Sequence, residues 1–290
     1  AARIDHPTQA PDLVREALKQ LKTGRPRPVE LEMAMDVMGQ QSEVSLLPPE
    51  SHTALAPDPE QIEQVAKQLC LAKRPIFVVG GGAQHASSEV LRLAEMLQAP
   101  VTFFRSGKGV IDERHYLSQS FPAGHRLWAD ADVVLAIGTR LKYQQMYWGL
   151  DKNLKILRID IDPTEINRIS TPEIGIVADA RTALEALLPL VESHNIPRPS
   201  RTEELNYLKT EFQEAFEDKI APQMGYLRVI REELPEDGFF VDEVTQVGFA
   251  SWYAFPTYHP RHFISAGYQG TLGYGYATAL EVQAAHPDKK

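Results

Sequence analysis

The chain has 290 residues, a formal net charge of −9 and a hydrophobic content of 43%, which is ordinary for a soluble globular protein of two or three domains. The acidic charge argues against nucleic acid and anionic lipid as partners, and no apolar run reaches the roughly 18 residues needed to cross a membrane. A single cysteine, Cys70, excludes an internal disulfide framework, and no signal peptide opens the sequence, so we expect a cytoplasmic protein.

The first 47 residues predict one helix and one strand. Apolar residues recur at helical spacing in 11–24, and Val29, Leu31 and Met33 alternate as in a strand. One helix and one strand cannot bury both of their faces. We therefore interpret 1–47 as the C-terminal tail of a larger domain, which a family resemblance identifies as a pyrimidine-binding domain.

Residues 48–194 alternate between strand and helix patterns. The predicted strands are short, continuous and rich in Val and Ile, which is typical of parallel strands buried on both faces. They are PIFVVGGG, PVTFF, ADVVLAIGTR and KILRIDIDP, separated by helical stretches. The pattern predicts an α/β fold with doubly wound parallel sheets and a Rossmann-like central domain, whose ligands would lie at the carboxyl ends of the strands.

The remaining sequence predicts a linker and the start of another α/β domain. Residues 195–221 begin with a proline-rich break and continue as a charged helix. In 222–290 we expect a helix, the strand FFVDEV, a second helix, the strand HFISAG and then a glycine-rich helix entry. We interpret 222–290 as the N-terminal part of a diphosphate-binding domain.

Polar residues and glycines end several of the central strands. Gly81 and Gly82 follow one strand, where a nucleotide backbone could come close, although a tight passage from strand to helix requires glycine equally well. Arg140 and Asp160 end two later strands, and an acidic residue in such a place often accepts hydrogen bonds from a ribose. Asp162 is instead expected to cap the helical turn that follows it.

The last fifty residues carry the most informative pattern. A strand ends at Val241 and is followed by Thr245 and Gln246, which could donate hydrogen bonds to phosphate oxygens. The glycines of the later segment let a ligand approach the backbone, and a helix that starts there offers N–H groups to an anion. Asp242 and Glu243 would repel that anion unless they point away or bind another partner.

The segment SAGYQGTLGYGYATALEVQAAHPDKK resembles the corresponding segment of thiamine diphosphate-dependent enzymes of the acetolactate synthase group. GRPRPVELEMAMDV, RPIFVVGGG, ADVVLAIGTR, RIDIDP and VDEVTQVG are similar to other segments of that family, in the same order along nearly the whole chain. The resemblance implies that Thr245, Gln246 and Val247 lie against the diphosphate. It also implies that Gly267 belongs to the same cofactor site.

The resemblance assigns two further roles in the glycine-rich segment. The carbonyl of Gly270 would accept a hydrogen bond from the exocyclic amine of the aminopyrimidine. Leu272 stands where the family usually has methionine, and it would be the apolar wedge that bends the cofactor. Leucine keeps the volume and apolarity of methionine, so we expect the wedge to function.

Other parts of the family's site fall outside the sequence. The GDG motif that binds Mg²⁺ is expected beyond Lys290, and the catalytic glutamate is expected before Ala1, so this chain is interpreted as an inactive fragment with no metal ligand and no known catalytic residue. Residues 121–126 and 139–145 differ from the family's flavin-binding segments. FAD is therefore doubtful, and the central domain is expected to hold an ADP-like group or nothing.

The resemblance implies an enzyme that uses thiamine diphosphate and Mg²⁺ on a 2-oxo acid and joins a second carbonyl after decarboxylation. A simple decarboxylase of the same family is the alternative within the class. Outside this class of enzyme, the alternatives are a non-catalytic module that binds FAD or NAD and an inactive homologue. The family builds its sites between subunits, so we expect a homodimer or homotetramer. The sequence does not indicate which 2-oxo acid is used.

Overall fold

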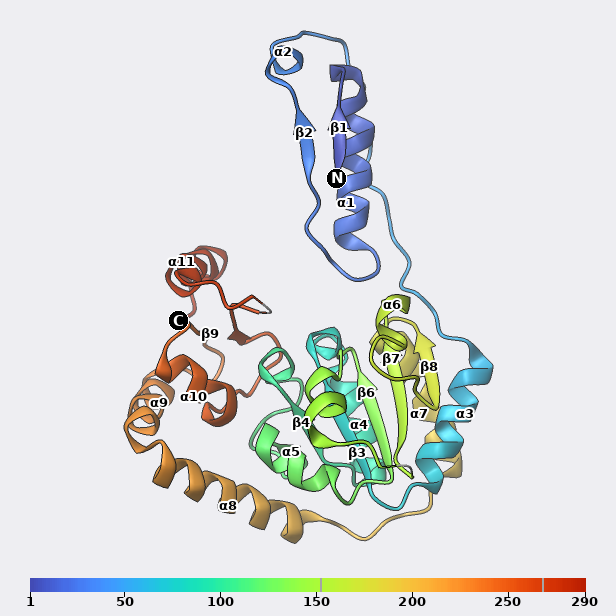
Figure 1. Cartoon of the computed structure of the whole chain (residues 1–290), viewed down its shortest axis with the longest axis vertical. Helices are drawn as coiled ribbons and strands as arrows, with labels where there is room; N and C mark the ends of the chain where they lie inside the picture. The colour runs from blue at the N-terminus through green and yellow to red at the C-terminus, as the bar shows by residue number, and fades with distance from the viewer. Residues whose placement is uncertain (152, 268) are drawn as a thin grey trace. The chain divides into compact units, whose positions relative to one another are not determined.

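A computed structural model describes residues 1–151, 153–267 and 269–290. The chain forms two compact units, residues Ala1–Ala56 and Pro57–Lys290, which Figure 1 draws from blue to red along the sequence. Among the described residues, no helix is long and apolar enough to span a membrane.

The first unit is a small α/β element with little buried surface. The predicted strand is confirmed as β2 (Leu31–Met33), but it pairs in parallel with a strand that the sequence analysis missed, β1 (Ala2–Ile4). The predicted helix is confirmed as α1 (Ala10–Lys22), after a 3-10 turn at Pro7–Gln9, and a short helix α2 (Met35–Met38) follows. Much of the apolar stripe of α1 stays exposed, 41% at Val14 and 47% at Leu18.

The second unit contains a six-stranded parallel sheet, which confirms the predicted α/β fold. The strand order is β5-β4-β3-β6-β7-β8, so the chain leaves β3 first to one side and then to the other. The strands are β3 (Pro75–Val79), β4 (Val101–Phe103), β5 (Ser118–Gln119), β6 (Val133–Ile137), β7 (Lys155–Asp160) and β8 (Ile174–Val177). Every residue of β3 and β6 is buried, as expected for central strands of this kind.

Helices connect these strands and cover the core. They are α3 (Pro59–Leu71), α4 (Ser87–Leu97), α5 (Phe121–Trp128), α6 (Pro163–Ile166) and α7 (Ala180–His194), with short 3-10 turns at Gly81–Ala83 and Arg105–Gly107 and a π-helical turn at Gln144–Trp148. The carboxylates of Asp58 and Asp179 cap α3 and α7. Cys70 is a half-buried residue of α3, where burial raises the pKa of its thiol.

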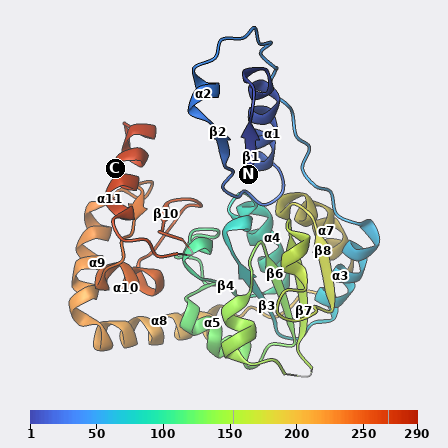
Figure 2. The same ribbon diagram turned by 45° about the horizontal axis from the view of Figure 1, so that its top comes forward.

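The C-terminal elements pack beside this sheet (Figure 2). They are α8 (Thr202–Lys219), α9 (Ala221–Glu233), β9 (Phe240–Val241), α10 (Gln246–Ala254), β10 (Phe263–Ile264) and α11 (Tyr274–Ala285). Helix α8 is more than a connection, because Leu205 and Leu208 are buried in the same core as the central sheet. The domain bounds 1–47, 48–194, 195–221 and 222–290 stay predictions.

Glu204 fixes the start of α8. It accepts hydrogen bonds from Arg201 and Arg74, and these guanidinium groups lower the pKa of the Glu204 carboxyl to about 2. Since this pKa is depressed on folding, the ion pairs stabilise the folded chain above the ordinary pKa of 4.5 and are lost as the pH falls toward 2. We expect Glu204→Gln to lower the free energy of unfolding at pH 7, with a difference from wild type that shrinks below pH 4.5 in denaturation experiments.

Candidate functional site

The two stretches that the sequence analysis assigned to one ligand lie at the same edge of a small sheet. Strands β9 and β10 pair in parallel, with Val241 opposite Ile264, so their carboxyl ends are adjacent. The backbone N–H of Asp242 donates to the carbonyl of Ile264 (2.9 Å), which extends the pairing past the strand ends. The turn before α10 and the segment that leads to α11 therefore start side by side, as a shared ligand site requires, and their convergence on one cofactor stays a prediction.

Asp242 joins this edge to two neighbouring segments. Its side chain is buried and accepts hydrogen bonds from the indole N–H of Trp252 (2.5 Å) and the backbone N–H of Ala266 (3.2 Å). Trp252 belongs to α10, and Ala266 lies at the start of the glycine-rich segment. The carboxylate points away from any ligand on the exposed side of the turn, because both of its oxygens are used inside the fold.

Glu243 holds the other end of the same segment. Its carboxylate accepts hydrogen bonds from the N–H groups of Val244 and Gly275, both at 2.7 Å. The N–H groups of Val244, Gly275 and Gly273 lower the pKa of the Glu243 carboxyl below its ordinary value. The Gly275 N–H at the start of α11 is thus bonded to the chain's own carboxylate. This N–H is therefore not open to a bound anion, and the expectation that the helix entry offers N–H groups to an anion stays a prediction for its other residues.

The N-terminus of α10 begins with exposed residues. Thr245 is the N-cap residue, and its hydroxyl accepts the N–H of Gly248 (2.9 Å). Thr245 and Gln246 are exposed, Val247 is half-buried, and the Gln246 amide oxygen accepts a hydrogen bond from Gln223 (2.8 Å). A helix N-terminus that is open to solvent attracts an anion through its N–H groups and dipole. These three predicted residues therefore fit a diphosphate.

The predicted residues of the glycine-rich segment lie on an exposed loop. Gly267 and Gly270 have φ angles of 69° and 62°, a left-handed conformation that favours glycine. A Cβ added at Gly270 would meet nothing within 4 Å, so the space beside its backbone is open. The side chain of Leu272 is 75% exposed. All three belong to the connection between β10 and α11, and their contacts with a cofactor stay predictions.

Backbone contacts join the two loops of the predicted nucleotide site on the central sheet, in which Gly81 and Gly82 stay exposed. The N–H of Gly82 donates to the carbonyl of Gly138 (3.0 Å), and the N–H of Gly80 donates to Ile137 (3.1 Å). A Cβ on Gly82 would lie 2.8 Å from the Cα of Gly138. Gly82 thus allows the loops after β3 and β6 to meet, at the point where the strand order would otherwise open a crevice. Gly81 is exposed and makes no such contact.

The other two candidate nucleotide ligands are bonded within the fold. The Arg140 guanidinium lies 3.7 Å from the buried carboxylate of Glu165. Asp160 accepts the N–H of Asp162 (3.0 Å), and Asp162 caps α6 through the N–H of Thr164, which confirms the predicted cap. These contacts fix the loop after β7.

Sequence reasoning missed Arg158, which is almost fully buried in β7. Its guanidinium donates to the carbonyls of Thr139 (3.0 Å), Glu165 (2.6 Å) and Ile166 (2.9 Å). Burial lowers the pKa of this guanidinium, and the charges of Asp160 and Glu165 oppose that effect. The signal that could have found it is a charged residue in the middle of an otherwise apolar strand.

The segments that differ from the family's flavin-binding pattern have packing roles. In α5, a Cβ on Gly124 would overlap the side chain of Thr102, so α5 lies directly on β4. Phe121 and Tyr143 surround Phe104, with ring centroids 4.9 and 5.5 Å away. Phe104 also contacts Trp252 of α10 at 5.6 Å, so aromatic rings pack between part of the central sheet and α10. Within the described ranges, no cluster of three or more Asp, Glu, His or Cys residues could hold a metal ion.

Comparisons with known proteins agree with this geometry. The family model of the thiamine pyrophosphate enzyme central domain matches residues 62–187. The acetolactate synthase isozyme 1 large subunit of Escherichia coli is 28% identical over 99% of this chain and 53% of its own length. A probable 2-ketoarginine decarboxylase of Pseudomonas aeruginosa is 30% identical over 98% and 52%. A probable acetolactate synthase large subunit of Methanocaldococcus jannaschii is 31% identical over 98% and 53%.

Residues 62–187 form a thiamine pyrophosphate enzyme central domain. Nearly the whole chain is similar to acetolactate synthase large subunits, as the resemblance indicated. The chain spans about half the length of the curated relatives it matches.

Proposed function

We propose that the full-length protein is a thiamine diphosphate- and Mg²⁺-dependent enzyme that acts on a 2-oxo acid and joins a second carbonyl compound after decarboxylation. The observation that carries the proposal is the meeting of two segments at one edge. The exposed N-terminus of α10 and the left-handed glycines of 265–273 follow neighbouring parallel strands. The relatives named as acetolactate synthases support carboligation.

The residues of this chain would bind and orient the cofactor. The diphosphate would lie against Thr245, Gln246 and Val247, where the helix dipole of α10 favours negative charge. The Gly270 carbonyl would accept from the aminopyrimidine, Gly267 would keep the loop in its left-handed conformation, and Leu272 would support the bent cofactor. When bound, thiamine diphosphate supplies an electron sink for the loss of CO₂ from a 2-oxo acid. Binding there would cover the apolar side chain of Leu272, which is now exposed.

We assign metal binding and proton transfer to residues other than those named above. Mg²⁺ would be held by a motif that follows the described segment, and proton transfer would depend on a glutamate from the pyrimidine-binding domain. No catalytic residue is assigned in the chain, so we propose that its 290 residues alone are inactive. We also propose a homodimer or homotetramer in the cytoplasm, with transferase or lyase activity.

For the central domain we propose a structural role without FAD. The close contact of Gly82 with Gly138 supports this proposal, because it brings the loops after β3 and β6 together where a dinucleotide would approach the backbone. The aromatic side chains around Phe104 support it as well, since they occupy part of the region between the sheet and α10. The same contacts disfavour a non-catalytic module that binds NAD or FAD.

A simple 2-oxo acid decarboxylase is the second candidate. The relative named as a probable 2-ketoarginine decarboxylase is 30% identical over 98% of this chain, which favours it specifically. Product analysis distinguishes a carboligase from a simple decarboxylase. Incubation of the full-length enzyme with a 2-oxo acid gives a hydroxyketo product for a carboligase and a free aldehyde for a decarboxylase.

Gln246→Glu tests the proposed diphosphate site. A glutamate at the first turn of α10 favours the helix dipole, so the folded protein should keep its melting temperature. The added carboxylate repels a diphosphate, so the Kd for thiamine diphosphate with Mg²⁺ should rise at least about tenfold in calorimetric titration of the full-length protein.

Gln40→Glu is the matched control, because Gln40 is exposed in the other unit. Wild-type protein should also gain melting temperature with thiamine diphosphate plus Mg²⁺ and none with NAD or FAD. Unchanged affinity in Gln246→Glu, or stabilisation by NAD or FAD instead, contradicts the proposal.

A further inference from the structure

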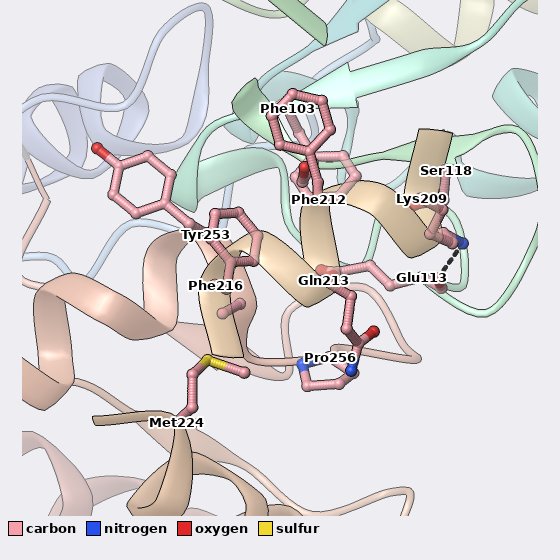
Figure 3. Close-up of a pocket in the computed structure, with 12 residues that line it drawn as sticks. Phe103, Glu113, Ser118, Lys209, Phe212, Gln213, Phe216, Met224, Tyr253 and Pro256 are labelled. Carbon is pink, nitrogen blue, oxygen red and sulfur yellow. Dashed lines mark hydrogen bonds between the residues drawn. The ribbon is translucent and has the colours of Figure 1, made fainter. Parts of the chain in front are cut away.

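A partly enclosed cavity of about 100 Å³ lies between the central sheet and the helices α8, α9 and α10 (Figure 3). It is separate from the edge of β9 and β10, since none of the predicted cofactor-binding residues lines it. Its walls come from β4, from residues 113–120, from α8, from Met224 of α9 and from the end of α10. Nothing in the proposed function uses this space.

One end of the cavity is polar and contains unsatisfied hydroxyl groups. Ser118 and Ser120 have the alternate spacing that places side chains on the same side of an extended segment. In the described part of the chain, neither hydroxyl has a hydrogen-bond partner, and Ser118 is only 1% exposed. A buried hydroxyl without a partner costs about 1–3 kcal/mol, so a polar atom in the cavity would stabilise this arrangement.

Lys209 lies at the same end. Its ammonium donates to the carbonyls of Glu113 (2.6 Å) and His115 (2.8 Å), and the same His115 carbonyl accepts the N–H of Ser118 (3.0 Å). Figure 3 shows Lys209, Glu113 and Ser118 together. An ammonium group has three N–H donors, and these two bonds leave one for a ligand.

Lys209 is the cation that faces the polar end of the cavity. The carboxylates that act on it are those of Glu113 and Asp112, and both have another cation as partner. Glu113 is paired with the buried Lys108 (2.9 Å), and Asp112 is paired with Arg114 (2.7 Å), which also pairs with Glu236 (2.8 Å). Burial lowers the pKa of the Lys209 ammonium. An anion bound beside it in the cavity would oppose that effect and stabilise the charged form.

The opposite end of the cavity is apolar. Phe212 and Gln213 lie three and four residues after Lys209, and Phe216 lies four and three residues after them, which places the four on one face of α8. Phe212 and Phe216 follow Lys209 toward Met224, and their side chains make the apolar wall. A ligand that fits this wall has one charged end and a short hydrocarbon end.

We propose that the cavity binds a short monocarboxylate, with its carboxylate on Lys209 and Ser118 and its alkyl end against Phe212 and Phe216. The size agrees with this class, because a cavity of about 150 Å³ holds the six heavy atoms of benzene, so about 100 Å³ in a partly enclosed cavity suits a ligand of about four or five heavy atoms. The site does not depend on the proposed function, and its occupant binds in the absence of thiamine diphosphate.

The probe is propionate, measured by saturation-transfer NMR on the full-length protein without cofactor. Propionate should bind saturably, and 1-propanol, which lacks the charge, should bind at least about tenfold more weakly. Lys209→Met keeps the length of the side chain but removes the ammonium, and it should weaken propionate at least about tenfold. Lys219→Met, at an exposed position of the same helix, is the matched control and should bind like wild type.

Ser118→Ala provides a variant that does not threaten folding, because it removes a hydroxyl that has no partner among the described residues. Its melting temperature should equal or exceed that of wild type, and propionate should bind severalfold more weakly. Equal binding of propionate and 1-propanol would overturn the proposal. Unchanged propionate binding in Lys209→Met and Ser118→Ala would do the same and would leave water as the occupant.

Discussion

Glu243→Gln should weaken thiamine diphosphate binding by the full-length protein about tenfold. The carboxylate accepts two N–H groups, from Val244 and Gly275, whereas a glutamine amide offers one acceptor oxygen and places its NH₂ against the other donor. The start of α11 would lose its attachment to β9, and the preceding loop would be held less firmly for the cofactor. Calorimetric titration with thiamine diphosphate and Mg²⁺ measures the change.

The exposed Glu281 of α11 provides the control, and Glu281→Gln should bind the cofactor like wild type. The pH dependence adds a second check. Backbone N–H groups lower the pKa of Glu243, so its contacts are complete above the ordinary value of 4.5 and are lost only as the pH falls through the lowered pKa. The difference between wild type and Glu243→Gln should therefore be constant from pH 6 to 8. A difference that changes in that range would show that another group is responsible.

Gly138→Ala should destabilise the second unit by about 3 kcal/mol. Gly138 has a φ of 55°, which costs an L-residue about 1–2 kcal/mol. The added Cβ would also meet the backbone of Gly82 and lie 2.8 Å from the N of Ala83, where overpacking costs about 1–3 kcal/mol. Urea denaturation followed by tryptophan fluorescence measures it, since Trp128, Trp148 and Trp252 all lie in this unit.

Gly81→Ala is the matched control one loop away. The nearest atom to its added Cβ is 3.7 Å distant, and its φ is not in the left-handed region. Such a substitution should be neutral or stabilise by about 0.4–1 kcal/mol, because it restricts the unfolded chain. Equal losses in Gly81→Ala and Gly138→Ala would mean that the contact of the two loops is not the cause.

The central fold was predictable because its main strands are apolar throughout. Runs such as Ile76–Val79 and Val133–Ile137 are buried on both faces, so their composition alone marks them. Strand β5 escaped prediction because its two residues, Ser118 and Gln119, are polar. Strand β1 escaped because three residues form it, and its partner β2 lies 29 positions later in the sequence.

The candidate site was predictable as a location but not in its internal contacts. The order of polar turn and glycine-rich segment indicated two loops at one sheet edge. The partners of Asp242 and Glu243 could not be read in the same way, because both accept backbone N–H groups that lie 24 and 32 residues away. Almost any residue type can donate a backbone N–H, so the sequence does not indicate which residue the donor belongs to. The cavity beside Lys209 was missed for a related reason, since it exists only where α8 packs across the sheet.

The aromatic contacts between Phe104 and α10 have a mechanical consequence. Phe104 follows β4 directly, and the loop that begins at its neighbour Arg105 places a guanidinium 4.5 Å above the ring of Trp252. Trp252 is the same side chain that donates to Asp242 at the end of β9. Trp252 thus connects the edge of the central sheet to the proposed cofactor edge. Weakening the contact of Trp252 with Phe104 would shift the proposed diphosphate-binding turn without changing any residue that is proposed to contact the cofactor.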